Sequence, residues 1–357
     1  MDVALVYNVK KEENETSASV PQPSSQTQQT THTQIQVTSN ADAFAEWDTI
    51  ETIHAVRDAL SLRHSVTLIE ADENAFASLK SSKPDIVFNI AEGRFGASRE
   101  AQIPAMLEML NIPYTGSDPL TLGICLDKSR AKEILSYYKI ANPKFAVISS
   151  LSELRSLEFP VPAMVKPLFE GSSKGIFDKS LVNSVKELTE QVTKVIEEYG
   201  QPALVEEFLP GREFTVAMLG NGNDLKVLPI VEIKFDSLPS GVNPIYSYEA
   251  KWIWDQSSNP LEIFECPAKV DASLKTAIEE LCRNTYNALR CRDWSRIDVR
   301  LDKNGRPNII EINPLPGILP KIEDNSCFPK AARMAGMNYS EMLNTVMNAG
   351  MKRYNLS

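Results

Sequence analysis

The residues best suited to chemistry lie in a predicted β-hairpin near the C-terminus. Residues 296–301 and 309–313 alternate polar with apolar side chains, and the Asn304-Gly305 pair between them favours a two-residue turn. Such a turn places four polar residues in two opposed pairs on one face of the sheet: Asp298 with Glu311, and Arg296 with Asn313.

Two carboxylates in opposed positions repel each other unless a positive charge lies between them. The side-chain oxygens of Asp298, Glu311 and Asn313, completed by phosphate oxygens of a ligand, match the ligands that Mg²⁺ prefers. The alternative is a solvated outer face on which Arg296 and Arg300 neutralise the acids. The pattern alone leaves both interpretations open.

A second segment has the composition of a phosphate-binding loop. Lys166 ends a predicted strand, and Glu170-Gly-Ser-Ser-Lys-Gly175 follows it. Hydroxyls and backbone amides on a flexible loop can bind a polyphosphate and close over it. The loop is not a Walker A motif, because Gly-Lys-Ser/Thr occurs nowhere in the chain. An ordinary surface turn is the alternative.

The same loop matches the Gly-x-Ser-x-Gly pattern of serine hydrolases at residues 171–175. A serine hydrolase with this motif also needs a catalytic histidine later in the chain. All three histidines lie within the first 64 residues, which argues against a hydrolase and leaves Ser173 as a hydroxyl that faces phosphate.

A third segment, residues 204–213, is predicted to be an extended linker between two sheets. Its backbone N–H and C=O groups could pair with an adenine ring, and the Glu213 carboxylate could accept hydrogen bonds from ribose hydroxyls. A charged connector between domains is the alternative.

Composition narrows the classes of protein. The 357 residues are 43% apolar and carry a net charge of −10, which predicts no nucleic-acid or membrane partner. There is no apolar run long enough to span a membrane and no secretory leader pattern, so we expect a cytoplasmic protein. The five cysteines contain no Cys-x-x-Cys and are expected to be reduced thiols.

The remaining pattern predicts the elements that position these residues. Strand and helix patterns alternate up to about residue 120, which is typical of a parallel α/β domain. Residues 14–40 interrupt that domain with 19 Ser, Thr, Gln or Asn residues out of 27, so we expect a disordered polar insert at about 10–45. Further along, the sequence predicts strands at 145–148, 162–166, 213–219, 226–233, 296–301 and 308–313, with a helix at about 272–290.

Taken together and in this order, these motifs resemble the ATP-grasp carboxylate–amine ligases, and most closely the D-alanine–D-alanine ligase family. The resemblance runs from about Asp85 to Gly336, and its ordered set of motifs is specific although each motif is weak alone. The residues that carry it are Ile112-Pro-Tyr-Thr-Gly-Ser117, Asp127-Lys128, Val165-Lys-Pro167, Glu170-Gly-Ser-Ser173, Glu206 to Thr215, Tyr248-Glu-Ala-Lys251, Arg296-Ile-Asp298, Glu311-Ile-Asn313, Pro316-Gly317, Ala331-Ala332 and Ala335-Gly336.

The resemblance implies an α/β (α+β) ATP-grasp fold in three parts. These are an N-terminal α/β domain (1–120), a central lid domain (121–207) and a C-terminal catalytic domain (208–357). ATP would lie between the last two. Its phosphates would be held by Lys128, Lys166, Ser172 and Ser173, its adenine by Glu206, Glu207, Phe208 and Leu209, and its ribose by Glu213.

The resemblance also implies the reaction. ATP would phosphorylate one amino acid's carboxylate, and a second amino acid's amine would attack the resulting acyl phosphate. Two Mg²⁺ ions, which Mn²⁺ could replace, would bind Asp298, Glu311 and Asn313. Lys251 and the Ser173 loop would contact the transferred phosphate, and Arg296 and the Gly317 amide would stabilise the oxyanion. Ser326 would hold the second substrate's carboxylate, and family members are commonly homodimers.

Two departures from the family concern the substrates. The usual Gly-Gly-x-Ser-x-Glu stretch after the first strand is absent, and Glu92 or Glu100 could supply the missing ammonium contact. Trp252 stands where D-alanine–D-alanine ligases usually have tyrosine, and an indole can donate but not accept a hydrogen bond. We therefore keep two alternatives: a ligase for another dipeptide or a depsipeptide, and a non-catalytic nucleotide-binding module.

Overall fold

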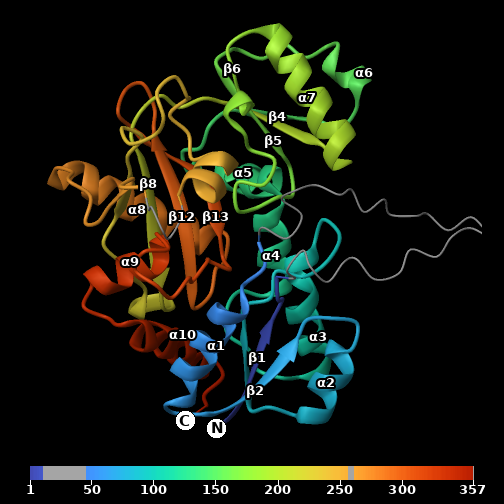
Figure 1. The fold of residues 1–357 in the computed structure, drawn as a ribbon, viewed down its shortest axis with the longest axis vertical. Helices are drawn as coiled ribbons and strands as arrows, with labels where there is room; N and C mark the ends of the chain where they lie inside the picture. Colours follow the sequence, from blue (N-terminus) through green and yellow to red (C-terminus); the bar gives the residue numbers. More distant parts are fainter. Residues whose placement is uncertain (11–45, 256–260, 357) are drawn as a thin grey trace, which may run out of the picture.

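A computed structural model describes residues 1–10, 46–255 and 261–356, which are built around three β-sheets (Figure 1). The polar insert predicted at about 10–45 lies, apart from residue 10, outside the described residues.

The N-terminal sheet is parallel, as the alternating pattern predicts, with the strand order β2-β1-β3. Buried side chains at Ile53, Val56 and Leu60 face this sheet at helical spacing, and the helix that carries them begins at Thr49, whose hydroxyl accepts from the Thr52 amide. The elements are β1 (Asp2–Tyr7), α1 (Ile50–Ser61), β2 (Ser65–Glu70), α2 (Ala75–Ser82), β3 (Ile86–Asn89), η2 (Arg99–Ala101) and α3 (Gln102–Leu110).

The central sheet is antiparallel, with the order β4-β7-β5-β6, and lies at the top of Figure 1. It has its own core, in which Val165 and Val205 of the sheet pack with Val192 of the covering helix. The elements are β4 (Phe145–Ile148), α6 (Leu151–Leu154), β5 (Ala163–Pro167), η3 (Asp178–Ser180), β6 (Leu181–Val182), α7 (Val185–Tyr199) and β7 (Ala203–Glu207).

The C-terminal sheet is antiparallel, with the order β11-β10-β8-β12-β13 and β9 beside β8. The prediction of one strand over 226–233 is wrong, because Pro229 lacks the N–H that a continuous ladder needs. The elements are β8 (Glu213–Leu219), η4 (Gly222–Asp224), β9 (Lys226–Val227), β10 (Val231–Ile233), a π-helix, η5 (Glu249–Trp254), β11 (Phe264–Glu265), α8 (Ala272–Ala288), β12 (Trp294–Leu301), β13 (Pro307–Asn313), α9 (Cys327–Met334) and α10 (Tyr339–Arg353).

Two helices, α4 (Pro119–Leu126) and α5 (Lys128–Tyr137), connect the N-terminal and central sheets. Asp127 separates them and caps α5 by accepting from the amides of Ser129 and Arg130. Leu135 of α5 packs in the core of the C-terminal sheet, beside Ile297 of β12. The domain boundaries at 120 and 207 stay a prediction.

The last helix returns to the N-terminal domain, so both termini lie at the same end of the molecule (Figure 1). Leu343 and Met347 of α10 share one core with Ile53 and Leu60 of α1. Among the described residues, no helix combines the length and apolar character needed to cross a membrane. All five cysteines are free thiols.

The β12–β13 hairpin confirms the predicted pairing at the residues assigned to the site. Arg296 lies opposite Asn313, and Asp298 lies opposite Glu311. The predicted two-residue turn is wrong. Leu301 pairs with Pro307, and Gly305 has a positive φ of 75° in a longer loop. A β-bulge after Asp298 leaves Ile310 without an opposite residue and restores the predicted register.

Candidate active site

Two adjacent cavities lie where the three sheets meet, and they share a wall formed by Lys251, Arg296 and Glu311 among others. The first, of about 120 Å³, lies between the central and C-terminal sheets. The second, of about 420 Å³, lies between the C-terminal sheet and the N-terminal domain.

Every residue that the sequence assigned to the site lines at least one of these cavities. The first cavity has Lys166, Ser172, Ser173, Glu206, Glu207, Phe208, Leu209, Glu213, Lys251, Arg296, Asp298 and Glu311. The second has Lys128, Ser172, Lys251, Trp252, Arg296, Glu311, Asn313, Gly317 and Ser326. Their roles toward ligands stay predictions.

A buried group of three charges forms one side of the first cavity. The Glu206 carboxylate contacts the ammonium groups of Lys166 and Lys132, with 2.9 Å between Glu206 Oε2 and Lys132 Nζ. Burial alone would raise the pKa of Glu206, but the two ammonium groups outweigh burial and lower the pKa to about 2. Lys132 Nζ also donates to the carbonyl of Ile310, the bulge residue, at 3.2 Å.

The two opposed carboxylates of the hairpin are each neutralised by a cation. Arg296 donates to both oxygens of Asp298, at 3.1 and 2.9 Å, and Thr215 donates to Asp298 Oδ1 at 2.6 Å. Lys128 Nζ lies 3.0 Å from Glu311 Oε1. The alternative of a solvated outer face is wrong, because the Asp298 and Glu311 side chains are only 15% and 22% exposed and line a cavity.

Arg300 has a different role from the one that alternative gave it. It donates to Glu213 Oε2 at 2.7 Å and packs over the Phe208 ring. Glu213, the predicted ribose ligand, therefore enters the first cavity already paired with a buried guanidinium.

The loop after β5 is held against the C-terminal domain. Ser173 donates its hydroxyl to the Tyr246 carbonyl at 2.9 Å, and Trp252 Nε1 donates to the Ser172 carbonyl at 3.0 Å. Ser172 and Ser173 both have positive φ, and at Gly175 a Cβ would lie 2.3 Å from Pro167 Cγ. Trp252 thus contacts the serine loop as a donor only, as expected for an indole.

Two cationic side chains, Lys251 and Arg296, lie on the shared wall. Burial and the nearby Arg296 guanidinium lower the pKa of Lys251 to about 8. Lys251 lies in the π-helix, and its Nζ is 5.1 Å from the centroid of the Trp252 ring.

The second cavity has an acidic wall formed by Asp48, Glu92 and Glu100. Burial raises the pKa of Asp48 to about 7 and, together with neighbouring carboxylates, that of Glu100 to about 8. Burial and the Glu100 charge raise the pKa of Glu92 as well. A cationic ligand in the second cavity would stabilise the ionised forms of these three carboxyl groups. On the opposite side, Ser326 Oγ donates to the Gly317 carbonyl at 3.1 Å.

Five residues that build the site were not assigned to it from the sequence: Glu46, Arg99, Lys132, Thr215 and Arg300. A local signal existed for Lys132, which lies four residues after Lys128 and so on the same face of α5. Glu46 and Arg99 gave no such signal, because they meet across 53 residues of sequence.

Comparison with known proteins agrees with this geometry. The family model described as "D-ala D-ala ligase C-terminus" matches residues 136–348. The D-alanine–D-alanine ligase of Bordetella petrii is 32% identical over 283 residues, which cover 79% of this chain and 80% of that protein. The chain belongs to the D-alanine–D-alanine ligase family.

Two further comparisons concern another relative and the fold. The uncharacterized protein y4sG of Sinorhizobium fredii is 35% identical over 82% of this chain and 84% of its own length. The crystal structure of the Bacillus anthracis D-alanine–D-alanine ligase complexed with ATP shares the fold, with a TM-score of 0.69, 22% identity and 99% coverage of both chains. The resemblance read from the motifs is confirmed, and so are the ATP-grasp fold and an ATP-dependent ligase activity.

Proposed function

We propose that this enzyme joins the carboxyl group of one small amino acid to the amine of another, with ATP activating the carboxyl group as an acyl phosphate. The observation that carries the proposal is the wall shared by the two cavities. Lys251 and Arg296 face both, so a phosphate in the first cavity and a carboxylate in the second would meet between them.

ATP would lie in the first cavity, with its base against the backbone of residues 207–209 and its ribose near Glu213. Lys166 would contact the phosphates. Lys128, which already contacts the Glu170 carbonyl and Glu311, would contact them from the second cavity. The Ser172–Ser173 loop would cover the phosphates and exclude water.

Asp298, Glu311 and Asn313 fit Mg²⁺ by the chemistry of their donors. Two carboxylates and an amide oxygen lie in opposed or neighbouring register positions, and phosphate oxygens complete such a site. Among the described residues, no group of three or more His, Cys, Asp or Glu residues is suited to hold a metal ion. Bound Mg²⁺, of which we propose two ions, would neutralise charge on the transferring phosphoryl group.

The chain's own residues would act in two steps. In the first, a carboxylate oxygen bonds to the γ-phosphorus and ADP leaves, while Lys251 offsets the charge on the transferred group. In the second, the uncharged amine nitrogen bonds to the acyl carbon, the C–O bond to phosphate breaks, phosphate leaves with that electron pair, and the nitrogen releases a proton. Arg296 and the Gly317 amide would stabilise the oxyanion between these events.

The acidic wall of the second cavity would bind the amine groups of the substrates. Glu92 or Glu100 would bind the first substrate's ammonium in place of the family's usual glutamate, and Ser326 would bind the second substrate's carboxylate. The acidic wall and Trp252 support substrates other than two D-alanines, including a different dipeptide or a depsipeptide. A non-catalytic nucleotide-binding module has no use for Lys251 and Arg296 on the shared wall.

The test is phosphate release from ATP and Mg²⁺ with a panel of D- and L-amino acids and hydroxy acids, singly and in pairs, with products identified by mass. We expect an amide product that Lys251→Met abolishes and Lys234→Met preserves, because Lys234 pairs with Glu265 and lines neither cavity. ATP binding with no product from any pair would refute the ligase proposal for these substrates.

The family resemblance also supports a cytoplasmic homodimer formed through the N-terminal domain. Light scattering coupled to size-exclusion chromatography tests the dimer, and a mass of about 40 kDa would contradict it.

A further inference from the structure

Arg99 lies in η2 of the N-terminal domain and reaches into the central domain. Its side chain is 9% exposed, and it donates from Nη2 to both oxygens of Glu46 at 2.8 Å. From Nη1 it donates to the Phe169 carbonyl at 2.8 Å, and Nη2 also lies 3.3 Å from Glu170 Oε2. One guanidinium therefore connects the N-terminal domain to two consecutive residues of the loop after β5.

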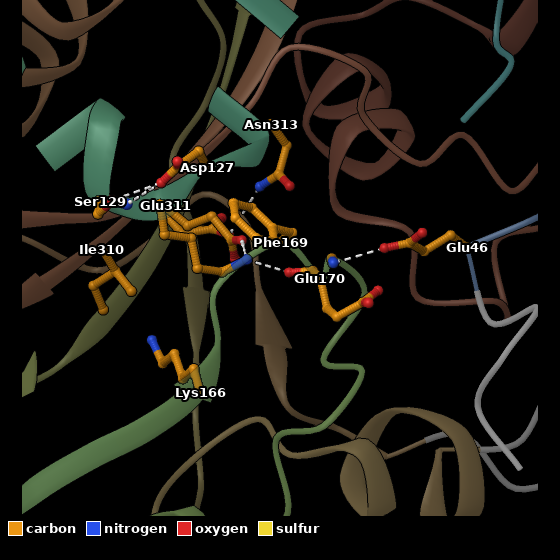
Figure 2. Close-up of polar contacts among 12 residues, drawn as sticks. Glu46, Asp127, Ser129, Lys166, Phe169, Glu170, Ile310, Glu311 and Asn313 are labelled. Atoms are coloured by element: carbon orange, nitrogen blue, oxygen red, sulfur yellow. Dashed lines mark hydrogen bonds and ion pairs between the residues drawn. The ribbon is translucent and has the colours of Figure 1, made fainter. Parts of the chain in front are cut away.

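The partners of Arg99 extend this connection along the loop. Glu46 Oε1 accepts from the Gly171 amide at 2.6 Å, and Figure 2 shows Glu46 pointing at the loop that carries Glu170. Glu170 also contacts Lys174, at 3.1 Å, and accepts from Gln201 at 2.8 Å. We call Glu46, Arg99 and Glu170 the loop clamp.

The loop clamp is buried, so its two carboxylates need the Arg99 guanidinium to neutralise their charge. Glu46 and Glu170 side chains are 8% and 10% exposed. Removing one partner of a buried charged group leaves the others uncompensated, and the structure relaxes by opening to water. Arg99 belongs to the N-terminal domain, whereas Lys174, whose charge also acts to lower the pKa of Glu46, lies on the loop itself.

We propose that Arg99 is a positioning residue that, through Glu46 and Glu170, holds residues 169–174 closed over the boundary between the two cavities. In doing so it determines whether the activated carboxyl group meets an amine or water. The chemical consequence rests on the proposed function. The contacts by which Arg99 holds the loop do not depend on that function.

The consequence is a change in how the acyl phosphate is used. When an amine attacks the acyl carbon, one amide forms and one phosphate leaves for each ATP consumed. When water attacks instead, its oxygen bonds to the acyl carbon, phosphate leaves with the electron pair of the broken C–O bond, and a proton is released. The net reaction is then ATP hydrolysis with the amino acid regenerated.

The first arm of the test uses hydrogen–deuterium exchange of the 169–175 backbone in the full-length protein without any ligand. We expect Arg99→Met to raise exchange there at least about tenfold, since hydrogen bonds to charged groups are strong ones, and Arg99→Lys to fall between it and the wild type. The matched control is Arg94→Met, because Arg94 pairs with Glu73 at a more exposed position. Unchanged exchange in Arg99→Met overturns the inference.

The second arm measures phosphate released per amide formed, with ATP, Mg²⁺ and D-alanine as the probe. We expect a ratio near one for the wild type and Arg94→Met, and a ratio several-fold higher for Arg99→Met and Glu46→Gln. Raised exchange with an unchanged ratio would overturn the role in excluding water. If the wild type makes no amide from D-alanine, the first arm alone decides whether Arg99 holds the loop.

Discussion

The buried carboxylate of Glu206 gives the sharpest quantitative prediction. Replacing it with glutamine keeps the shape of the side chain but removes the negative charge between the ammonium groups of Lys132 and Lys166. Two buried ammonium groups would then face each other with no carboxylate between them, and the more distant Glu311 would be left as a shared negative charge. Removing one partner from a buried ion pair costs about 3–5 kcal/mol of unfolding free energy.

The pKa of Glu206 gives a second route to the magnitude. The native pKa of about 2 lies below the value of about 4.5 expected in the unfolded chain. A difference of that size is worth about 3 kcal/mol, and the two routes agree. Because the native pKa is the lower one, this stability is present above about pH 4.5 and is lost as the pH falls toward 2.

The assay is urea unfolding followed by circular dichroism at several pH values between 2 and 7. We expect Glu206→Gln to be about 3 kcal/mol less stable than the wild type at pH 7, with the difference shrinking toward zero near pH 2, where the wild-type carboxyl becomes protonated. Glu207→Gln is the matched control, because its exposed side chain should change stability by less than about 0.5 kcal/mol. A difference that does not depend on pH would refute the reasoning.

Three further predictions concern the cavities. The rate of ATP use at low ATP concentration should fall above about pH 8 as Lys251 loses its proton, and Lys251→Arg should remove that alkaline limb; a limb that persists would assign it to another group. Glu311→Ala should lower ligation on the order of a hundredfold or more without raising stability, because Lys128 already neutralises Glu311; thermal unfolding and product mass check both parts. Gly175→Ala should cost about 1–3 kcal/mol, because φ is +72° and the new Cβ would meet Pro167; a urea midpoint equal to that of the wild type contradicts it.

Much of the fold could be predicted from local patterns, and the family resemblance supplied the residues assigned to the site, all of which line a cavity. The alternation of polar and apolar residues placed β12 and β13, and the side of the sheet on which Asp298 and Glu311 lie follows from that alternation alone. The predicted register was correct at the site although the predicted turn was wrong, because the longer loop and the bulge at Ile310 offset each other by one residue each. The sequence could not show that these two shifts cancel, since the bulge depends on tertiary contacts such as the one between Lys132 and the Ile310 carbonyl.

The charge partners could not be predicted in the same way. Which cation neutralises which acid depends on how the three sheets meet, so Lys128 pairs with Glu311 across 183 residues and Arg300 pairs with Glu213 rather than with the hairpin acids. The loop clamp is the clearest case, because Glu170 belongs to a different domain from Glu46 and Arg99 in the predicted division, and the three residues share no spacing. The ordered motifs of the sequence were enough to recognise the family, and the resemblance supplied the site residues. Propensity and periodicity, which act locally, predicted the strands and helices and the shared face of the hairpin acids. Only the tertiary structure decided how those charges are paired and what holds the loop closed, because buried electrostatics depends on distances between segments that are remote in the chain.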